Sequence, residues 1–562
     1  MHAIAASGPA SLVHRLRGIW LHPLLLAVLA GTIIYPMGWA LVGSFQTEDG
    51  DWTLSHYHRV FSPYYIGVMS TTLAYAALST ALAMAVGAPL AWVVARSDMP
   101  GRALVRAGAT ITFVMPPLFH ALAFVVLFQP RAGLVNTWLE RLAGIRPFDI
   151  YSLTGMVFVT ALGLFPQLFI LIEAALRGVD PTLEEAARVT GGSRFRVARQ
   201  ITLPAVLPAV LSSALLGMIE VMALFGPPAV IGIPAKIYVM STQIYVELSG
   251  SPPRMEFSAA LSILFLITAG VLLAVQGRLV RRRSFAMVGG KGFRQRPVPL
   301  GPWRFVALAA CVALLLLALV VPAAVLVLIS VSRIWTAGPS VANLTLDFYR
   351  TALFGQGDTM LSLGNTILIA ATVLAATLLA GLPLSWIVAR SRGWSARLIR
   401  VVTFLPFSIP AVVFTVGIIL AFIRPPFVLY GTLGIIIVCY FGRFLPYAVQ
   451  PLSDAIRQVD HSLTEAARIV GSGPLRTGTR IVLPLLKYSA VSTALLIFVA
   501  CVREIVSIAL LYSPGTETVM MLAMRLWDEG RVQVTAALVV FTLVLVTVFY
   551  GLARLVARPK GI

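Results

Sequence analysis

Two loops of the chain carry the same residue pattern at the same spacing. Glu185–Gly191 reads E-A-A-R-V-T-G and is followed, after nine further residues, by Ile201–Pro204, which reads I-T-L-P. Glu465–Gly471 reads E-A-A-R-I-V-G and is followed, again after nine residues, by Ile481–Pro484, which reads I-V-L-P. The pattern combines a carboxylate, small residues and a glycine, and these residue types offer contacts rather than bond-breaking chemistry.

The residues around each pattern predict the local structure. Asp180 and Asp460 precede short amphipathic stretches, and carboxylates at such places favour the positive end of a helix dipole. The glycine that ends each pattern supplies a turn where a side chain would obstruct either a positive φ angle or the approach of a partner. Pro204 and Pro484 then predict the start of the next membrane helix.

The paired pattern resembles the signature loop of permease subunits of type I binding-protein-dependent ABC importers. In that family the loop forms a short helical hairpin that docks onto an ATP-hydrolysing subunit. The resemblance implies two permease halves on one chain, two cytoplasmic ATPase copies and an external solute-binding protein as partners. An ordinary loop rich in small residues is the alternative. The residues to which the resemblance gives the ATPase-coupling role are Glu185, Ala186, Ala187, Gly191, Glu465, Ala466, Ala467 and Gly471.

The chain itself has no motif for ATP hydrolysis or other catalysis. Gly290-Lys291 superficially matches a phosphate-binding loop, but Phe285 replaces its first glycine and Gly292 its Ser or Thr. The sequence shows no nucleophile paired with a base, no His/Cys metal spacing and no carboxylate dyad. The three cysteines are scattered through apolar runs, as expected of buried thiols. We therefore expect a transport subunit that is not an enzyme, has no cofactor of its own and depends on ATP bound by a partner.

Charged residues inside apolar runs are candidates for a translocation path, because charge is costly in a membrane. Glu220 and the pair Arg503-Glu504 lie at nearly equivalent places after the two loops. They could line the path, or they could form salt bridges that stabilise the helix bundle. Arg443 and His120 are weaker candidates of the same kind. Metal ligands are not identifiable from the sequence.

The composition predicts a membrane protein. Hydrophobic residues make up 59% of the 562 positions and charged residues only 12%. Twelve uncharged runs approach or exceed the roughly 20 residues of a spanning helix, and the shortest, Lys487–Arg503, requires continuation past Glu504. We therefore expect an all-α polytopic fold with about 12 transmembrane helices.

The net charge of +21 reflects topology rather than nucleic-acid binding. The lysines and arginines are spread through short loops between helices and form no compact basic domain. Most of the 43 fall on the side of the two repeated loops, so the positive-inside rule predicts cytoplasmic N and C termini. The first apolar run lacks a cleavage pattern and is expected to be a retained helix in a bacterial inner membrane.

The duplication extends beyond the loops. Gly87–Ser97 recurs as Gly381–Ser391, and Pro116 falls on Pro410, 294 residues later. The repeated loops are only 280 residues apart, so the first half has 14 extra residues, which we place in the external loop at 129–149.

Both signature loops must face one ATPase compartment, so each half needs an even number of spans. Two parallel six-helix repeats meet this requirement. We expect a first repeat at 1–280 with its signature loop at 180–206, a cytoplasmic linker at 281–303, and a second repeat at 304–562 with its loop at 460–486. Proline pairs are expected to kink or break helices in both repeats. They are Pro116-Pro117 and Pro227-Pro228 in the first, with Pro406 and Pro410 in the second.

The substrate is suggested by a second motif. Arg503-Glu504-Ile505, followed by Tyr512–Thr518, is similar to the ferric-iron permease group within the family. Thiamine, 2-aminoethylphosphonate and polyamine permeases share much of that plan and remain alternatives. A secondary transporter driven by an ion gradient would also have two parallel halves, but it has no use for two coupling loops. A structural membrane scaffold is the third class.

Overall fold

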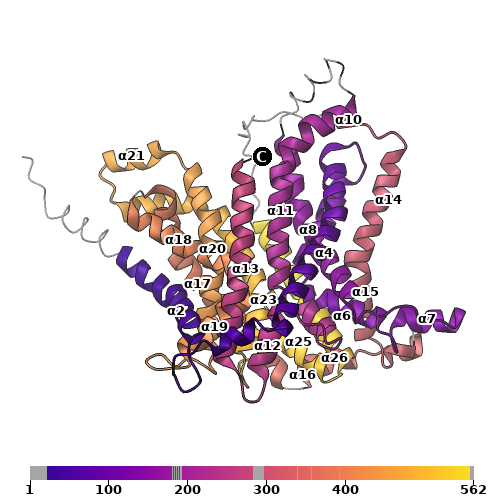
Figure 1. The fold of residues 1–562 in the computed structure, drawn as a ribbon. Coiled ribbons are helices and arrows are strands. Elements are labelled where there is room, and N and C mark those ends of the chain that lie inside the picture. Colours follow the sequence, from indigo (N-terminus) through magenta and orange to yellow (C-terminus); the bar gives the residue numbers. More distant parts are fainter. Residues whose placement is uncertain are drawn as a thin grey trace, which may run out of the picture. The chain divides into compact units, whose positions relative to one another are not determined.

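The computed structural model is helical throughout the part that it describes (Figure 1). It describes residues 22–556 except 180, 181, 183, 185, 186, 188, 190, 192, 283–296, 338, 339, 356 and 392. Within these residues there is no β-strand, only isolated β-bridges. The predicted all-α fold is confirmed.

Ten helices among the described residues are long and apolar enough to cross a membrane, and two bent helix pairs raise the number to twelve if each pair is one span. These match the twelve predicted runs. The ten are His22–Gly43, Pro63–Arg96, Leu153–Gly178, Ala198–Ala223, Met255–Arg278, Trp303–Ser330, Asp358–Arg390, Leu433–Gln458, Gly478–Arg503 and Val532–Phe549.

The two bent pairs break at prolines. Helix α5 (Arg102–Val114) meets α6 (Pro117–Phe128) at 94°, and α18 (Trp394–Ser408) meets α19 (Ala411–Phe422) at 112°. The backbone is extended just before each break-point proline, because the proline ring disfavours a helical conformation in the preceding residue. The predicted breaks at Pro116 and Pro410 are confirmed, while Pro406 lies inside α18.

The two halves repeat their helix boundaries. Helix α4 (Pro63–Arg96) has the same length as α17 (Gly357–Arg390), and α8 (Leu153–Gly178) has the same length as α20 (Leu433–Gln458). The first pair is offset by 294 residues and the second by 280, as the sequence repeats are. Two repeats are thus visible in the backbone as well as in the sequence.

The 14 extra residues lie where they were predicted. Between α6 and α8 the chain forms an additional amphipathic helix, α7 (Leu134–Ala143). The corresponding connection between α19 and α20, at 423–432, contains no helix. Asn136 of α7 is buried and its Nδ2 donates to the carbonyl oxygens of Gln129 and Phe148, so the inserted segment folds on itself.

The chain forms two compact units, and each combines parts of both sequence halves. One unit contains 1–53, 360–521 and 545–562, and the other contains 54–359 and 522–544. In the first unit, α2 (Tyr35–Gly43) packs on α19 so closely that a Cβ added at Gly417 would lie 2.6 Å from the carbonyl oxygen of Pro36.

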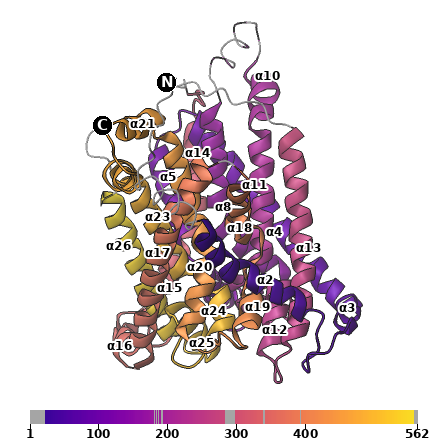
Figure 2. The same ribbon diagram turned by 90° about the vertical axis from the view of Figure 1, so that its left-hand side faces the viewer.

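In the second unit, α14 (Trp303–Leu315) packs on α5, and α15 (Val321–Ser330) packs on α6 (Figure 2). The first helix of each half therefore packs with helices of the other half. The compact units differ from the predicted repeats for this reason, and the repeat boundaries stay a prediction.

Shorter helices connect the long ones. The remaining elements of five or more residues include α3 (Ser55–Val60), α12 (Met240–Ser249), α13 (Met255–Arg282), α16 (Asp347–Phe354), α24 (Val506–Leu511), α25 (Val519–Asp528) and α26 (Val532–Val556), with π-helical turns at Ala30–Ile34, Pro228–Gly232 and Leu316–Val320. The Pro227-Pro228 pair opens the second of these turns, after the preceding membrane helix has ended at Ala223.

One predicted boundary is wrong. The run Lys487–Arg503 does not continue past Glu504, because α23 spans Leu483–Arg503 and Glu504 has an extended backbone. The missing length lies at the other end, where a π-helical turn at Gly478–Val482 leads into the helix. Lys487 is accommodated within the helix, as a long side chain can be when its stem lies along apolar surface.

Candidate coupling loops and membrane-embedded charges

The two repeated loops lead into their membrane helices through identical elements. The first has α10 (Arg194–Val197), a π-helical turn at Ala198–Thr202 and α11 (Leu203–Ala223). The second has α22 (Pro474–Thr477), the turn at Gly478–Val482 and α23. Every boundary is displaced by 280 residues. Each membrane helix begins with its predicted proline.

The glycine of each pattern has the backbone conformation that the sequence predicts. The φ angle is +85° at Gly191 and +75° at Gly471. A Cβ added at either glycine would meet no atom within 4 Å among the described residues. The left-handed backbone therefore explains the two glycines, since crowding within the described chain does not.

The second loop displays part of its pattern on the surface. Helix α21 (His461–Ile469) carries Glu465 and Ala466 exposed, whereas Ala467 is buried. The amide of Ser462 donates to Oδ1 of Asp460 over 2.9 Å, which confirms the predicted helix start. Ile469 and Val470 beyond the helix are more than four-fifths exposed, so an apolar surface lies beside the carboxylate.

The first loop is described in part. Asp180, Glu185 and Ala186 lie outside the described residues. Ala187 is half-buried, and Val189, which corresponds to Ile469 of the second loop, is 88% exposed.

Arginines at the ends of the long helices anchor both loops. Arg96, the last residue of α4, places Nη2 3.4 Å from Oε1 of Glu184, and the same oxygen accepts a 2.7 Å hydrogen bond from Thr202 Oγ1. Arg390, the equivalent residue of α17, donates from Nη2 to the carbonyl oxygens of Ile456 and Val459. Sequence reasoning missed this role, although the repeat Gly87–Ser97 contains the arginine and could have indicated it.

Among the five path candidates, the structure brings Arg443 and Glu504 together. Arg443 Nη1 lies 2.6 Å from Glu504 Oε1 and donates to Ser507 Oγ over 2.8 Å. The amide of Ser507 donates back to Glu504 Oε1 over 2.9 Å. Both charged side chains are mostly buried. This arrangement joins α20 to the break between α23 and α24, as a stabilising salt bridge would.

The other three candidates lie at separate places. His120 is buried in α6, and its Nε2 lies 2.9 Å from the carbonyl oxygen of Ala318. Glu220 is an exposed residue of α11, and Arg503 is the last, half-buried residue of α23. His120 thus contributes to packing between α6 and the first helix of the other half.

A further buried acid escaped sequence reasoning. Glu247 of α12 is 8% exposed and accepts a 2.7 Å hydrogen bond from Tyr65 and a 3.0 Å bond from Gln243. Arg254 lies 3.2 Å from its other oxygen. Glu247 lies between two apolar runs, so a search for charges within such runs does not select it.

The motif Tyr512–Thr518 forms a tight loop between α24 and α25. The amide of Ser513 accepts no proton but donates to Thr516 Oγ1 over 2.8 Å, and Gly515 has φ +88°. Asn365 of α17 is 6% exposed, and its Nδ2 donates to the carbonyl oxygens of Gly515 and Glu517, each over 3.0 Å. The motif is therefore positioned by hydrogen bonds to a membrane helix.

The described residues contain no cluster of three or more His, Cys, Asp or Glu side chains that could hold a metal ion. The three cysteines, Cys311, Cys439 and Cys501, are buried.

Comparison with known proteins identifies the family. The model of the binding-protein-dependent transport system inner membrane component matches residues 83–285 and again residues 381–560. Each match contains one repeated loop, and together they cover more than half of the chain.

Individual relatives are ferric transport proteins. The chain is 28% identical over 440 residues to the ferric transport system permease protein FbpB of Actinobacillus pleuropneumoniae, covering 76% of this chain and 62% of the relative. It is 27% identical over 472 residues to the putative ferric transport system permease protein FbpB 1 of Haemophilus influenzae, covering 82% and 70%.

A solved bacterial ABC transporter involved in alginate import is similar with a TM-score of 0.37 and 21% identity, over 44% of this chain and 88% of that one. The family match rests on both halves of the sequence, and the helices form a multi-pass membrane protein. The chain belongs to the family of binding-protein-dependent transport system inner membrane components.

Proposed function

We propose that this chain is the permease subunit of an ATP-driven importer and forms the translocation path for ferric iron. The duplicated loop carries the proposal. Its two copies have identical element boundaries, each contains a glycine with positive φ, and each is anchored by the arginine that ends a long helix. A pair of matched, surface-displayed loops suits two copies of one partner.

The partners follow from these loops. Two cytoplasmic ATPase subunits dock on them, with Glu185 and Glu465 making polar contacts and Ala186 and Ala466 permitting close packing. The ATPases bind ATP, so this chain carries no cofactor of its own. Closure of the ATPases moves both loops, and the helices alternate between inward and outward access. An external solute-binding protein delivers the substrate, and the N and C termini lie on the ATPase side of a bacterial inner membrane.

Ferric iron is the substrate that the comparisons favour. Two relatives carry ferric transport in their names, and the Tyr512–Thr518 motif is similar to the same group. Thiamine, 2-aminoethylphosphonate and polyamines remain alternative substrates for the same permease role. Glu220, Arg503 and His120 stay candidates for the path, whereas the contacts of Arg443 and Glu504 favour a stabilising role.

Retention of the ATPase tests the proposal directly. The variant Glu185→Ala/Glu465→Ala removes one carboxylate from each loop, and we expect the ATPase to co-purify in reduced amounts while the chain stays folded. Glu140→Ala/Glu529→Ala is the matched control, because it also removes two exposed carboxylates but outside the loops. Equal recovery of the ATPase with both variants would contradict the coupling role.

An energy test separates the importer from a gradient-driven transporter. Uptake by an ATP-driven importer stops when the partner ATPase is inactivated. Uptake by a secondary transporter survives that inactivation and collapses with an uncoupler while ATP is maintained.

A further inference from the structure

The largest cavity of the unit formed by 54–359 and 522–544 is lined by arginines. An open pocket of ≈ 830 Å³ lies at the end of α4, the following turn, the start of α5 and the end of α8. Arg96, Arg102, Arg106 and Arg177 line it, together with Asp98 and Pro297. Its volume is within the range of sites that bind small molecules.

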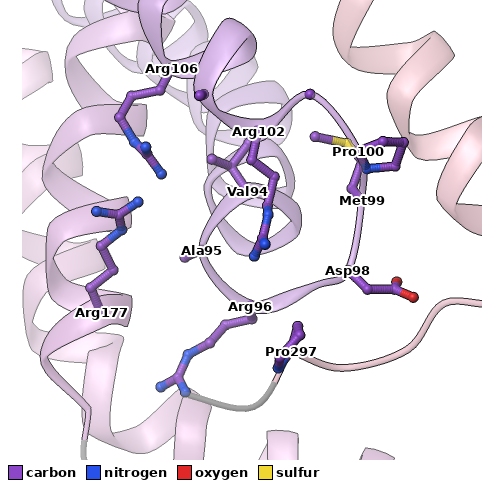
Figure 3. A pocket seen from close by; sticks show the side chains of 12 residues that line it. Val94, Ala95, Arg96, Asp98, Met99, Pro100, Arg102, Arg106, Arg177 and Pro297 are labelled. Atoms are coloured by element: carbon purple, nitrogen blue, oxygen red, sulfur yellow. The ribbon is translucent and has the colours of Figure 1, made fainter. Parts of the chain in front are cut away.

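The guanidinium groups face the pocket. Arg106 and Arg177 point toward one another, and Arg102 points into the space between them and Arg96 (Figure 3). Asp98 points away from the pocket, and its Oδ1 accepts a 2.9 Å hydrogen bond from the amide of Leu300. The exposed lining is therefore positively charged.

The acids nearby leave binding capacity on the arginines. Glu173 is 6% exposed and is shared by Arg106 at 2.7 Å and Arg177 at 2.9 Å. Arg96 is also 6% exposed, and its Nε and Nη2 have no hydrogen-bond partner among the described residues, although Nη2 is within salt-bridge distance of Glu184. Buried N–H groups of this kind are expected to have acceptors.

The second half shows what the same place is like without such a pocket. There the equivalent pocket measures ≈ 210 Å³, and Ala396 occupies the position of Arg102. Ser453 occupies the position of Glu173, and Arg390 spends Nη2 on two carbonyl oxygens. A general requirement of the fold would affect both copies, so the arginine pocket of the first half calls for a separate explanation.

We propose that this pocket binds a phosphate group. Arginine presents paired N–H donors that match phosphate oxygens, and four such side chains around one cavity can replace the water shell of the anion. Basic pockets between helices at a membrane surface bind lipid headgroups, but a soluble phosphate compound has the same chemistry. Because Arg96 also contacts Glu184 and so the first coupling loop, occupancy of the pocket competes with that contact.

Binding by the purified full chain tests this inference, and it needs neither the ATPase nor the transported substrate. One arm titrates pyrophosphate into the chain held in phosphatidylcholine nanodiscs and records the heat. The other arm releases the chain from nanodiscs that also contain cardiolipin and counts the retained lipids by native mass spectrometry. Binding in the first arm indicates a soluble ligand, and binding in the second alone indicates a headgroup.

The variants decide whether the pocket is responsible. Arg102→Ala/Arg177→Ala removes two lining guanidinium groups, and we expect affinity to fall about tenfold or more. Arg397→Ala/Arg457→Ala removes the same charge from the second half and is expected to leave affinity unchanged. Should the first variant fold poorly, Arg102→Ala alone reproduces the residue that the second half already has.

Two results would overturn the proposal. One is the absence of binding by the wild-type chain in both arms. The other is an equal loss of affinity in the two double variants, which would indicate nonspecific attraction of anions to a basic protein. Both are independent of whether the chain transports iron, so they leave the proposed transport function to its own test.

Discussion

Removing one partner of the Arg443–Glu504 pair is predicted to destabilise the protein strongly. The two charges are 2.6 Å apart, and their side chains are 18% and 10% exposed. At an effective dielectric constant of about 20, this separation corresponds to an attraction of about 6 kcal/mol. Burial costs several kcal/mol for each ion, so the net contribution of the intact pair is small.

The single variants differ from the double variant for that reason. Arg443→Met leaves Glu504 buried without its cation, and Glu504→Gln leaves Arg443 without its anion. Each is expected to reduce the free energy of unfolding by about 3–5 kcal/mol. The double variant leaves no uncompensated charge and is expected to cost about 2 kcal/mol or less, with Ser507 losing one hydrogen bond.

The assay is SDS-induced unfolding of the purified chain in mixed micelles, followed by helicity. The control is Arg457→Met, which breaks an exposed pair with Asp454 at 3.3 Å and is expected to cost about 0–1 kcal/mol. If the double variant costs as much as the two single variants together, the pair is not coupled and the reasoning is refuted. Unimpaired stability with lost uptake would instead indicate a role in the translocation path.

Three further predictions concern loops. Gly471→Val places a β-branched residue at φ +75°, which is expected to cost about 1–2 kcal/mol locally and to reduce ATPase retention; unchanged retention would show that the turn tolerates a side chain. The variant Glu185→Ala/Glu465→Ala is expected to lose ATPase without losing helicity, as measured by pull-down and circular dichroism. Asn365→Leu removes two hydrogen bonds to the Tyr512–Thr518 loop and is expected to cost about 1–3 kcal/mol, which an unaltered unfolding curve would contradict.

The sequence predicts those features of the fold that have local causes. Apolar runs give the spanning helices, and a proline marks the break in each bent pair, because its effect on the backbone does not depend on tertiary context. The repeat predicted the inserted segment at 129–149, since the two offsets differ by its length. The glycines of the loops were identified for the same reason, as only their backbone conformation was at issue.

Features that depend on distant contacts were not predictable. The packing of each half's first helix with the other half leaves no periodic signal in the sequence. Arg96 and Glu184 are far apart in the chain, and so are Arg443 and Glu504, so their pairing required coordinates. The boundary error at Glu504 has a physical cause too. Counting uncharged residues ends a helix at any lysine, although Lys487 lies within one.

Uptake of radiolabelled ferric iron tests the central claim most directly. Cells with and without this chain are compared, with thiamine, 2-aminoethylphosphonate and spermidine as unlabelled competitors. An iron importer predicts that uptake is lost without the chain, returns when the chain is restored and is insensitive to the competitors. Unchanged iron uptake in cells that lack the chain would contradict the assignment of ferric iron.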